Sequence, residues 1–439
     1  MLQIGHAYLT INNDLGRAVQ GASVANVAES IHDDLEANAL YLRDGDTAVL
    51  LISCDLAVLD SAFTRRACEA MSARCGIGAR DILIGCTHTH NGPVVLWTNR
   101  DKPVDEAYLD RLEGRLCELA ERAVQSARPG RVGFGGGWAK IGYNRRVCWA
   151  DGTHSMHGDT TRADYTGLEG PDDPRHVALF TYDSDGRITA VLHNNASHPT
   201  CGYGQPYYSA DFPGAARRHL RDVLGDIPVL FFNGAFGDLA IEDQASGAPL
   251  REDRDRMVQR AAHLLAGETL RLMHEAAALD DAPLAHACHE MTSPVRIPEP
   301  TRLDWARATL AKRDGGDAVR PFDLMFAHGI TYLHDSFADR PQETFTLHAV
   351  RIGGLGMVSV PGELFCQLGL DIKRRSPFAA TAILGATDGY IGYLPTTSGA
   401  LGGGYSGEPL QWTRIPHETC YRLVDEAAKL LHELWRSTG

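Results

Sequence analysis

Residues 81–93 read DILIGCTHTHNGP, an apolar run that leads into two histidines and closes on Gly-Pro. The run ILIG is typical of a buried strand, because it is short, apolar and bounded by turn-forming residues. Side chains at positions i and i+2 of an extended segment point to the same side, so we expect His88 and His90 to project together from the strand end. Such strand ends are where α/β proteins place their ligands.

Further strand-like runs alternate with amphipathic segments of helical period along the chain. The strand-like runs are 47–56, 176–182, 188–195, 227–234, 345–352, 355–362 and 378–386. The helical segments are 60–75, 104–126, 213–224, 251–276, 301–314, 363–374 and 418–436. This alternation predicts an α/β fold, and the SDGR turn at 184–187 predicts a hairpin. We therefore expect a mixed β-sheet core flanked by helices.

The domain organisation is expected to be simple. The sequence shows neither internal repeats nor a long linker, so residues 1–439 are expected to form a single domain. The segment 296–345 has the least regular pattern, and we interpret it as an insertion or a lid.

The composition argues against several classes of protein. A hydrophobic content of 44% with 22% charged residues is typical of a globular chain, and the net charge of −14 argues against a nucleic-acid partner. No apolar run reaches about 18 residues, so no membrane span is expected. The absence of a leader pattern and ten cysteines without a CxxC pair predict a cytoplasmic protein with reduced thiols. The expected partner is a small molecule, and a homo-oligomer is compatible with the sequence.

Three more apolar runs end in residues that can bind a metal or move a proton. His198 follows the run 188–195, Glu363 follows 355–362 at the expected start of a helix, and Tyr393 follows 378–386 in a glycine-rich loop. Each has an ordinary structural interpretation, such as a carboxylate favoured by a helix dipole. Together with the His-x-His segment, they predict a catalytic zinc site with one water molecule.

Several short segments, in the same order along the chain, resemble the non-lysosomal neutral ceramidases, a family of metal-dependent amidases. The segments are THTHNGP (87–93), YNRR (143–146), NASHPT (195–200), SADFPG (209–214), NGAFGDLA (233–240), PGE (361–363) and the pair Tyr393 and Tyr405. The resemblance implies the fold of the ceramidase catalytic domain. The family's carboxy-terminal immunoglobulin-like domain is expected to be absent.

The resemblance also implies residue roles. The zinc ligands fall on His88, His198, Glu363 and Tyr393. The catalytic residues fall on His90, Arg145 and Tyr405. The chemistry agrees, because zinc polarises a carbonyl and acidifies water, His90 can carry the proton, and Arg145 and Tyr405 can stabilise an oxyanion. The polar residues expected to orient the histidines are Thr87, Asn91, Asp211, Asn233 and Asp238.

One departure from the family concerns the substrate. Where ceramidases carry a serine in GDxSPN, this chain reads GDLAIED, and Ala240 takes the place of the serine. We see no leader, lipidation signal or basic amphipathic helix. We therefore expect zinc-dependent hydrolysis of the amide bond in a small soluble N-acyl amine rather than in ceramide.

The alternatives left open by the sequence are an ester or lactone hydrolase on the same site, a metal-dependent lyase, and a non-catalytic binding homologue. The sequence leaves the substrate, the oligomeric state, and the choice between zinc and a neighbouring metal undecided.

Overall fold

The computed structural model describes residues 2–21, 26–97, 102–246 and 253–437. The strands of the larger sheet are β1 (Leu2–Thr10), β3 (Glu36–Asp44), β4 (Thr47–Cys54), β5 (Ile82–Cys86), β6 (Arg128–Trp138), β11 (Arg175–Tyr182), β12 (Ile188–Asn195) and β14 (Val229–Asn233). Those of the smaller sheet are β16 (Leu284–Pro294), β17 (Gln342–Ile352), β18 (Leu355–Val360) and β20 (Ala380–Gly385). The helices are α1 (Ser61–Cys75), α2 (Glu106–Gln125), α3 (Asp211–Leu224), α4 (Arg254–Glu275), α5 (Pro300–Asp314), α6 (Pro321–Phe337), α7 (Cys366–Arg375), α8 (Thr397–Gly402) and α9 (His417–Arg436).

Both sheets mix parallel and antiparallel pairs. The larger runs β14-β12-β11-β6-β1-β3-β4-β5 and the smaller β16-β17-β18-β20. The pairs β4–β5, β12–β14 and β18–β20 are parallel, whereas the predicted hairpin of β11 and β12 is antiparallel. The prediction of a mixed α/β core is confirmed, with the strands divided between two sheets.

The larger sheet is folded into two halves around a shared core. Only three residue pairs join β1 to β6, and β14 at one edge lies against β3, β4 and β5. The smaller sheet packs against both halves, so that Leu42, Leu192 and Met357 from three strand groups share one buried cluster. This arrangement removes the apolar faces of all three groups from water, the dominant favourable term in folding.

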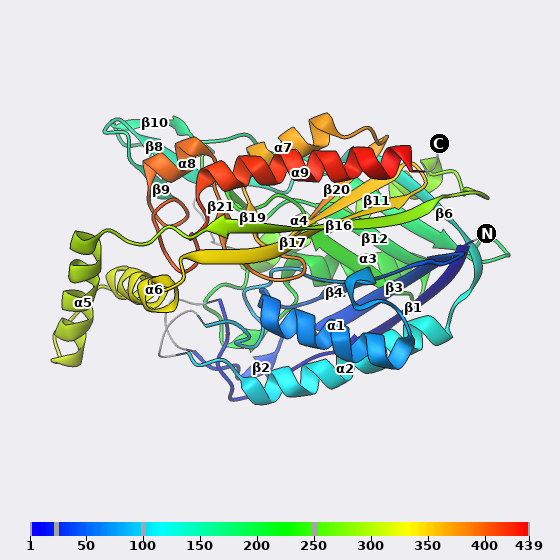
Figure 1. Ribbon diagram of the computed structural model, residues 1–439, viewed down its shortest axis with the longest axis horizontal. Helices are drawn as coiled ribbons and strands as arrows, with labels where there is room; N and C mark the ends of the chain where they lie inside the picture. Colours follow the sequence, from blue (N-terminus) through cyan, green and yellow to red (C-terminus); the bar gives the residue numbers. More distant parts are fainter. Residues whose placement is uncertain (1, 22–25, 98–101, 247–252, 438–439) are drawn as a thin grey trace.

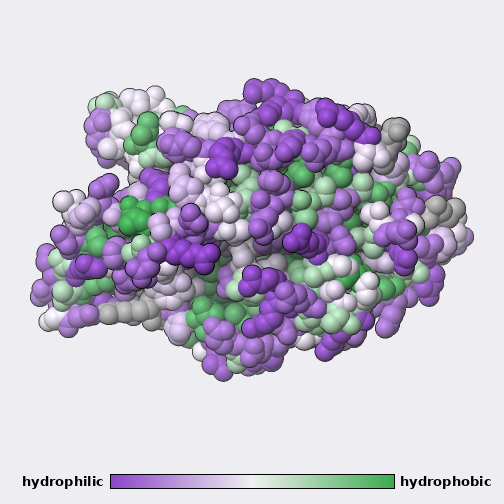
Figure 2. Space-filling model, viewed as in Figure 1, coloured by the Kyte–Doolittle hydropathy of each residue, from purple (hydrophilic) through white to green (hydrophobic). Residues whose placement is uncertain are grey.

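Pairs of helices cover the outside of this core. α1 and α2 pack on the half that contains β1 to β5, α3 and α4 on the half that contains β14, and α7 and α9 on the smaller sheet (Figure 1). α9 buries residues at helical spacing, including Leu423, Ala427 and Leu434. Figure 2 shows mostly hydrophilic side chains on the outward surface of α7 and α9, as expected for helices with one buried face.

The segment 296–345 holds two helices. α5 and α6 lie between β16 and β17, whose pairing runs to Pro294 and Gln342, and they project beyond the end of that hairpin (Figure 1). On α6, Phe326 lies 6.4 Å from the ring of Tyr405, and Tyr332 stacks on Trp97 at 4.1 Å. These contacts place α6 beside the loop that carries Tyr405. A lid function for the segment stays a prediction.

The carboxyl ends of the parallel strands meet at one end of the core. Ser53 at the end of β4 donates to the carbonyl oxygen of Phe231 in β14 at 2.6 Å, which joins the two halves of the larger sheet. The segments that follow β5, β12, β18 and β20 all lie at this end, because side chains from each of them contact one another. The fold thus brings together loops that are far apart in the sequence.

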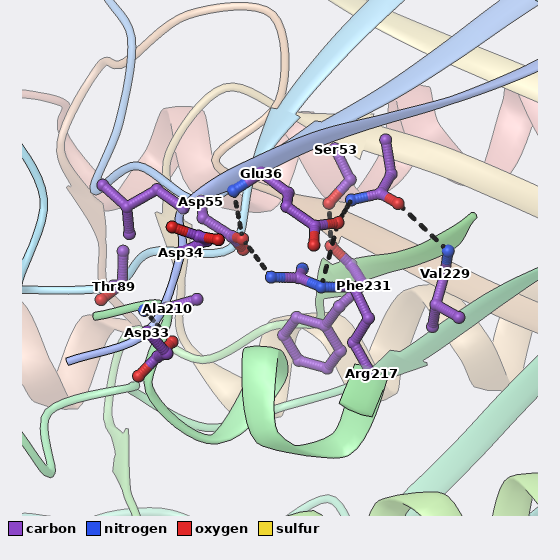
Figure 3. A network of polar contacts seen from close by, with 12 residues as sticks. Asp33, Asp34, Glu36, Ser53, Asp55, Thr89, Ala210, Arg217, Val229 and Phe231 are labelled. Atoms are coloured by element: carbon purple, nitrogen blue, oxygen red, sulfur yellow. Dashed lines mark hydrogen bonds and ion pairs between the residues drawn. The ribbon is translucent and has the colours of Figure 1, made fainter. Parts of the chain in front are cut away.

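A buried ion-pair network supports this end of the core (Figure 3). The Arg217 guanidinium of α3 lies 2.7 Å from Asp55 Oδ2 and 3.3 Å from Glu36 Oε2. Asp55 follows β4 and also accepts from the backbone N–H of Glu36. Only 5% of the Arg217 side chain is exposed, so its pair with Asp55 is shielded from water. Glu36 has a second partner, because Arg221 donates to both of its carboxylate oxygens at 2.8 and 2.9 Å.

Replacing Arg217 tests the role of this network in stability. We expect Arg217→Met to lower the free energy of unfolding by about 3–5 kcal/mol, because the buried carboxylate of Asp55 loses its ion-pair partner. The neighbouring Arg218 is the matched control, since its side chain is 47% exposed and pairs with Asp33 at 3.5 Å. Arg218→Met should cost at most about 1 kcal/mol. Equal losses in urea denaturation of the two variants would contradict the interpretation.

Candidate metal centre

His88 and His90 lie side by side at the end of β5. Their Nε2 atoms are 3.2 Å apart, so the predicted juxtaposition is confirmed. The backbone conformation that brings them together differs from the expected one, because His88 has a φ of 72° and is therefore left-handed rather than extended. Such a conformation is unfavourable for a residue with a Cβ, and strained residues of this kind cluster at functional sites. The backbone N–H of His88 donates to the Leu56 carbonyl, which helps hold this turn.

The other three predicted ligands converge on the same point. His198 Nε2 lies 2.9 Å from Glu363 Oε2 and 3.4 Å from the Tyr393 hydroxyl, and His88 Nε2 lies 3.6 Å from Glu363 Oε2. Glu363 belongs to β19 (Glu363–Leu364), which pairs in parallel with β21 (Tyr393–Leu394), so that Glu363 and Tyr393 are register partners. The expectation that Glu363 starts a helix is wrong, since α7 begins at Cys366. A short strand pair, not a helix, positions the carboxylate.

Backbone carbonyls orient the two imidazoles that face this carboxylate. His88 Nδ1 donates to the Ala57 carbonyl at 2.8 Å, and His198 Nδ1 donates to the Leu239 carbonyl at 2.8 Å. A carbonyl only accepts, so each Nδ1 carries the proton and each Nε2 presents a lone pair.

The polar residues predicted to orient the histidines act mainly on the backbone. Asn233 donates to the Ser197 carbonyl and accepts from its N–H, and Asp238 accepts from the N–H of Cys366. Asn91 donates to the Tyr207 carbonyl, and Asp211 accepts from the N–H groups of Gly202 and Phe212. They therefore fix the loops that carry the ligands rather than the imidazole rings.

The spacing of the donor atoms fits a tetrahedral metal ion. With metal–ligand bonds of about 2.0–2.1 Å, tetrahedral donors lie about 3.3 Å from one another. Three of the six donor–donor separations bracket this value, namely 2.9 Å for His198–Glu363, 3.6 Å for His88–Glu363 and 3.4 Å for His198–Tyr393. Two neutral nitrogens, a carboxylate oxygen and a phenol oxygen are a donor set that suits zinc.

The ionisation states favour a cation at this point. Burial lowers the pKa of His88 and of His90, and lowers that of His198 to about 3, so the three imidazoles are neutral at neutral pH. Burial alone would raise the pKa of Glu363, but the adjacent His88 and His198 outweigh it and lower that pKa below its ordinary value. Neutral imidazoles around an ionised carboxylate are the ligand forms that a metal requires.

His90 is the third imidazole of the cluster. The ring nitrogens of His88, His90 and His198 lie within 4.8 Å of one another, close enough for a three-histidine site. Two sets of metal ligands are therefore possible, and both contain His88 and His198. In one set His90 is also a ligand, and in the other it lies next to the ligands without binding the metal. The buried Nδ1 of His90 has no hydrogen-bond partner among the residues that the structure describes. Unlike the other two imidazoles, His90 is not fixed by a carbonyl at Nδ1, which suits a ring that exchanges a proton.

Arg145 and Tyr405 complete the set of predicted residues. Arg145 Nη2 lies 3.0 Å from His198 Nε2 and donates to the Tyr393 hydroxyl at 3.0 Å. The Tyr405 ring packs against Tyr393 at 5.7 Å, and burial raises the pKa of the Tyr405 hydroxyl, which stays protonated as a donor. The structure therefore brings all seven predicted residues together.

Tyr390 is a contact that the sequence interpretation missed. Its hydroxyl donates to Glu363 Oε1 at 2.7 Å, which leaves Oε2 facing the imidazoles. The sequence feature that could have identified Tyr390 is its position in DGYIGY, three residues before Tyr393 in the same glycine-rich loop.

A small cavity of about 90 Å³ opens beside these residues. Its walls are mostly aromatic or apolar, and its polar atoms lie at the candidate metal centre and at two glutamines. The lining consists of Gln20, Gly21, Ala57, Val58, His88, His90, Leu96, Glu363, Tyr390, Tyr393, Tyr405, Gln411 and Trp412. An apolar cavity with a few convergent polar groups is typical of a small-molecule site.

Two solved structures share the fold over nearly the whole chain. The neutral ceramidase from Pseudomonas aeruginosa gives a TM-score of 0.74 at 14% identity, over 99% of this chain and 74% of that chain. A ceramidase in complex with C2 gives a TM-score of 0.72 at 14% identity, over 99% of this chain and 75% of that chain. No family model and no curated protein matches the sequence. The resemblance to the neutral ceramidases is thus confirmed for the fold.

Metal analysis tests the ligand assignment. We expect purified protein to hold about one zinc ion per chain, and His88→Ala or His198→Ala to lose it, because each removes one of four donors. His274→Ala is the control, since His274 is exposed in the last turn of α4 and should leave the metal content unchanged. Full metal retention in both ligand variants, measured by atomic emission, would contradict the site.

Proposed function

We propose that the protein is a zinc-dependent hydrolase that cleaves the amide bond of a small N-acyl amine with a metal-activated water molecule. The observation that carries the proposal is the meeting of His88, His198, Glu363 and Tyr393 at tetrahedral spacing, next to an additional imidazole. A zinc ion held there would polarise the scissile carbonyl and lower the pKa of a water molecule.

His90 carries the proton in this proposal. Its neutral imidazole lies beside the ligands, so it can accept a proton from the attacking water and return it to the leaving amine. Arg145 and Tyr405 both contact Tyr393, and both can donate to the oxygen that becomes negative in the tetrahedral intermediate. Each role uses a group whose protonation state at neutral pH is the required one.

The cavity supports a small substrate. A cavity of about 90 Å³ beside the candidate ligands suits a short acyl group, and a long acyl chain would extend beyond it. Tyr390, Tyr405 and Trp412 form its aromatic walls, and Tyr405 and Trp412 pack at 5.1 Å. No helix in the described ranges has the length and apolarity required to span a membrane.

Ala240 stands where ceramidases carry a serine, and it lacks the serine hydroxyl. It lies in β15 (Leu239–Ala240), opposite Tyr143 of β7 (Tyr143–Asn144), and only 1% of it is exposed. It is not among the described residues that line the cavity. Ala240→Ser is therefore expected to leave the metal content unchanged and to alter only the activity.

Variants of His90 and Tyr405 separate proton transfer from metal binding. His90→Ala is expected to keep the metal and to lower turnover about 10²–10⁴-fold, because the general acid–base is lost. Tyr405→Phe should also keep the metal, with a loss of at most about 10²–10³-fold from the missing oxyanion donor.

Two results would change these roles. Loss of metal from His90→Ala would make His90 a ligand, as the three-histidine grouping allows. Near-normal turnover by the same variant would place proton transfer on another group, with Glu363 as the next candidate.

A substrate panel tests the reaction class. Short N-acyl amines are expected to be hydrolysed, with activity lost to a chelator and restored by zinc, while long-chain ceramide in detergent should be a poor substrate because of the small cavity. Matched esters with the same acyl groups serve as the comparison. Cleavage of the esters without detectable cleavage of the matched amides would favour an esterase, and efficient ceramide turnover would refute the proposed preference for short substrates.

A further inference from the structure

Arg145 and Arg146 are adjacent in the chain, but their side chains leave it in different directions. Arg145 reaches the candidate metal centre, where it donates to Tyr393. Arg146 begins β8 (Arg146–Trp149) and reaches the loop that carries Tyr405. Successive side chains of an extended segment point to opposite sides, so one dipeptide can serve both places.

The guanidinium of Arg146 makes four hydrogen bonds, and three of them go to one short loop. Nη1 donates to Ser406 Oγ at 2.8 Å, and Nη2 donates to the carbonyls of Gly403 at 2.9 Å and Gly399 at 3.2 Å. Nε donates to Glu169 Oε2 at 2.5 Å. The side chain of Arg146 is fully buried and that of Glu169 is 2% exposed, so this ion pair is shielded from water.

The segment from Gly399 to Ser406, called the 399–406 loop here, comprises the end of the short helix α8 and the glycine-rich turn that follows it. Its sequence GALGGGYS contains four glycines, and Gly403 and Gly404 adopt φ values of 72° and 73°, which few other residues tolerate. The hydrogen-bond partners of Arg146 lie on both sides of Tyr405 in the sequence. The carbonyls of Gly399 and Gly403 precede Tyr405, and the Ser406 hydroxyl directly follows it. The position of Tyr405 therefore depends on a side chain from elsewhere in the sequence.

Tyr405 is also held by its backbone, its ring and its hydroxyl. Its carbonyl accepts from Trp412 Nε1 at 2.9 Å, and its ring lies 5.7 Å from that of Tyr393, to which its hydroxyl is hydrogen-bonded. Arg146 adds a connection of another kind, because it joins the loop to β8, the strand that begins directly after Arg145.

We propose that Arg146 is a positioning residue, whose guanidinium, held by Glu169, sets the 399–406 loop so that the Tyr405 hydroxyl faces the metal centre. The proposal rests on the proposed function for the role of Tyr405, but not for the position of the loop. A lysine cannot replace Arg146, because one ammonium nitrogen cannot reach a carboxylate, two carbonyls and a hydroxyl that lie on different sides of a planar fork.

Hydrogen exchange tests the position of the loop without any assay of activity. In full-length, metal-loaded protein, Arg146→Met and the milder Arg146→Lys are expected to speed amide exchange in residues 399–406 by about tenfold or more, through more frequent local opening. Exchange in residues 82–86 should stay unchanged. Arg162→Met is the matched control, since Arg162 is exposed and pairs with Asp164 next to the same strands. Unchanged exchange in the loop of a folded Arg146→Lys variant would overturn the proposal.

A double-mutant cycle tests whether Arg146 acts through Tyr405. On a short N-acyl amine, Arg146→Lys should lower kcat with metal content retained and KM little changed. In a Tyr405→Phe background the same substitution should cost less than about twofold, because the group that it positions is already gone. Equal losses in both backgrounds would overturn the proposal. If no amide is cleaved by the unmodified protein, the proposed function fails, and the exchange measurement alone decides whether Arg146 holds the loop.

Discussion

The carboxylate of Glu363 is buried beside two imidazoles, and the arrangement of the candidate centre depends on how this charge is accommodated. Burying a carboxylate costs several kcal/mol unless it is paired or hydrogen-bonded. Here Oε2 lies 2.9 Å from His198, and Oε1 accepts from Tyr390 at 2.7 Å. Only one oxygen of Glu363 is thus directed to the imidazoles, and the backbone pairing of β19 with β21 places Tyr393 beside it.

The left-handed turn at His88 depends on the ion pairs beneath it. The carbonyls of Cys54 and Leu56 accept from the backbone N–H groups of Thr87 and His88. Asp55 lies between these two carbonyls, and Arg217 holds its carboxylate at 2.7 Å. The segment that holds this strained turn is thus fixed to α3 by a buried salt bridge. The stability of the core and the geometry of the candidate centre are therefore coupled through this segment.

The sequence predicted the parts of the fold that have a local signal. The run 188–195 coincides with β12, and His88 and His90 meet as expected, because alternation and strand ends are visible in a few consecutive residues. The strand pair that holds Glu363 and Tyr393 could not be predicted, since two-residue strands have no period and their pairing joins segments about 30 residues apart. For the same reason the division into two sheets was missed. This division depends on which strands far apart in the sequence pair with one another, and no local sequence pattern determines that pairing.

The agreement of fold at 14% identity, with no match to a family model, has a physical explanation. Core positions accept many apolar residues of suitable size, so the sequence of the strands can change while their packing persists. The candidate ligands at the strand ends would have less freedom, because binding of a metal ion would fix their separation to within a few tenths of an ångström. The cavity walls come partly from other residues, among them Val58, Leu96 and Trp412, whose side chains are not among the candidate ligands. Substitutions of these side chains can therefore change the shape of the cavity while the donor atoms at the strand ends stay the same.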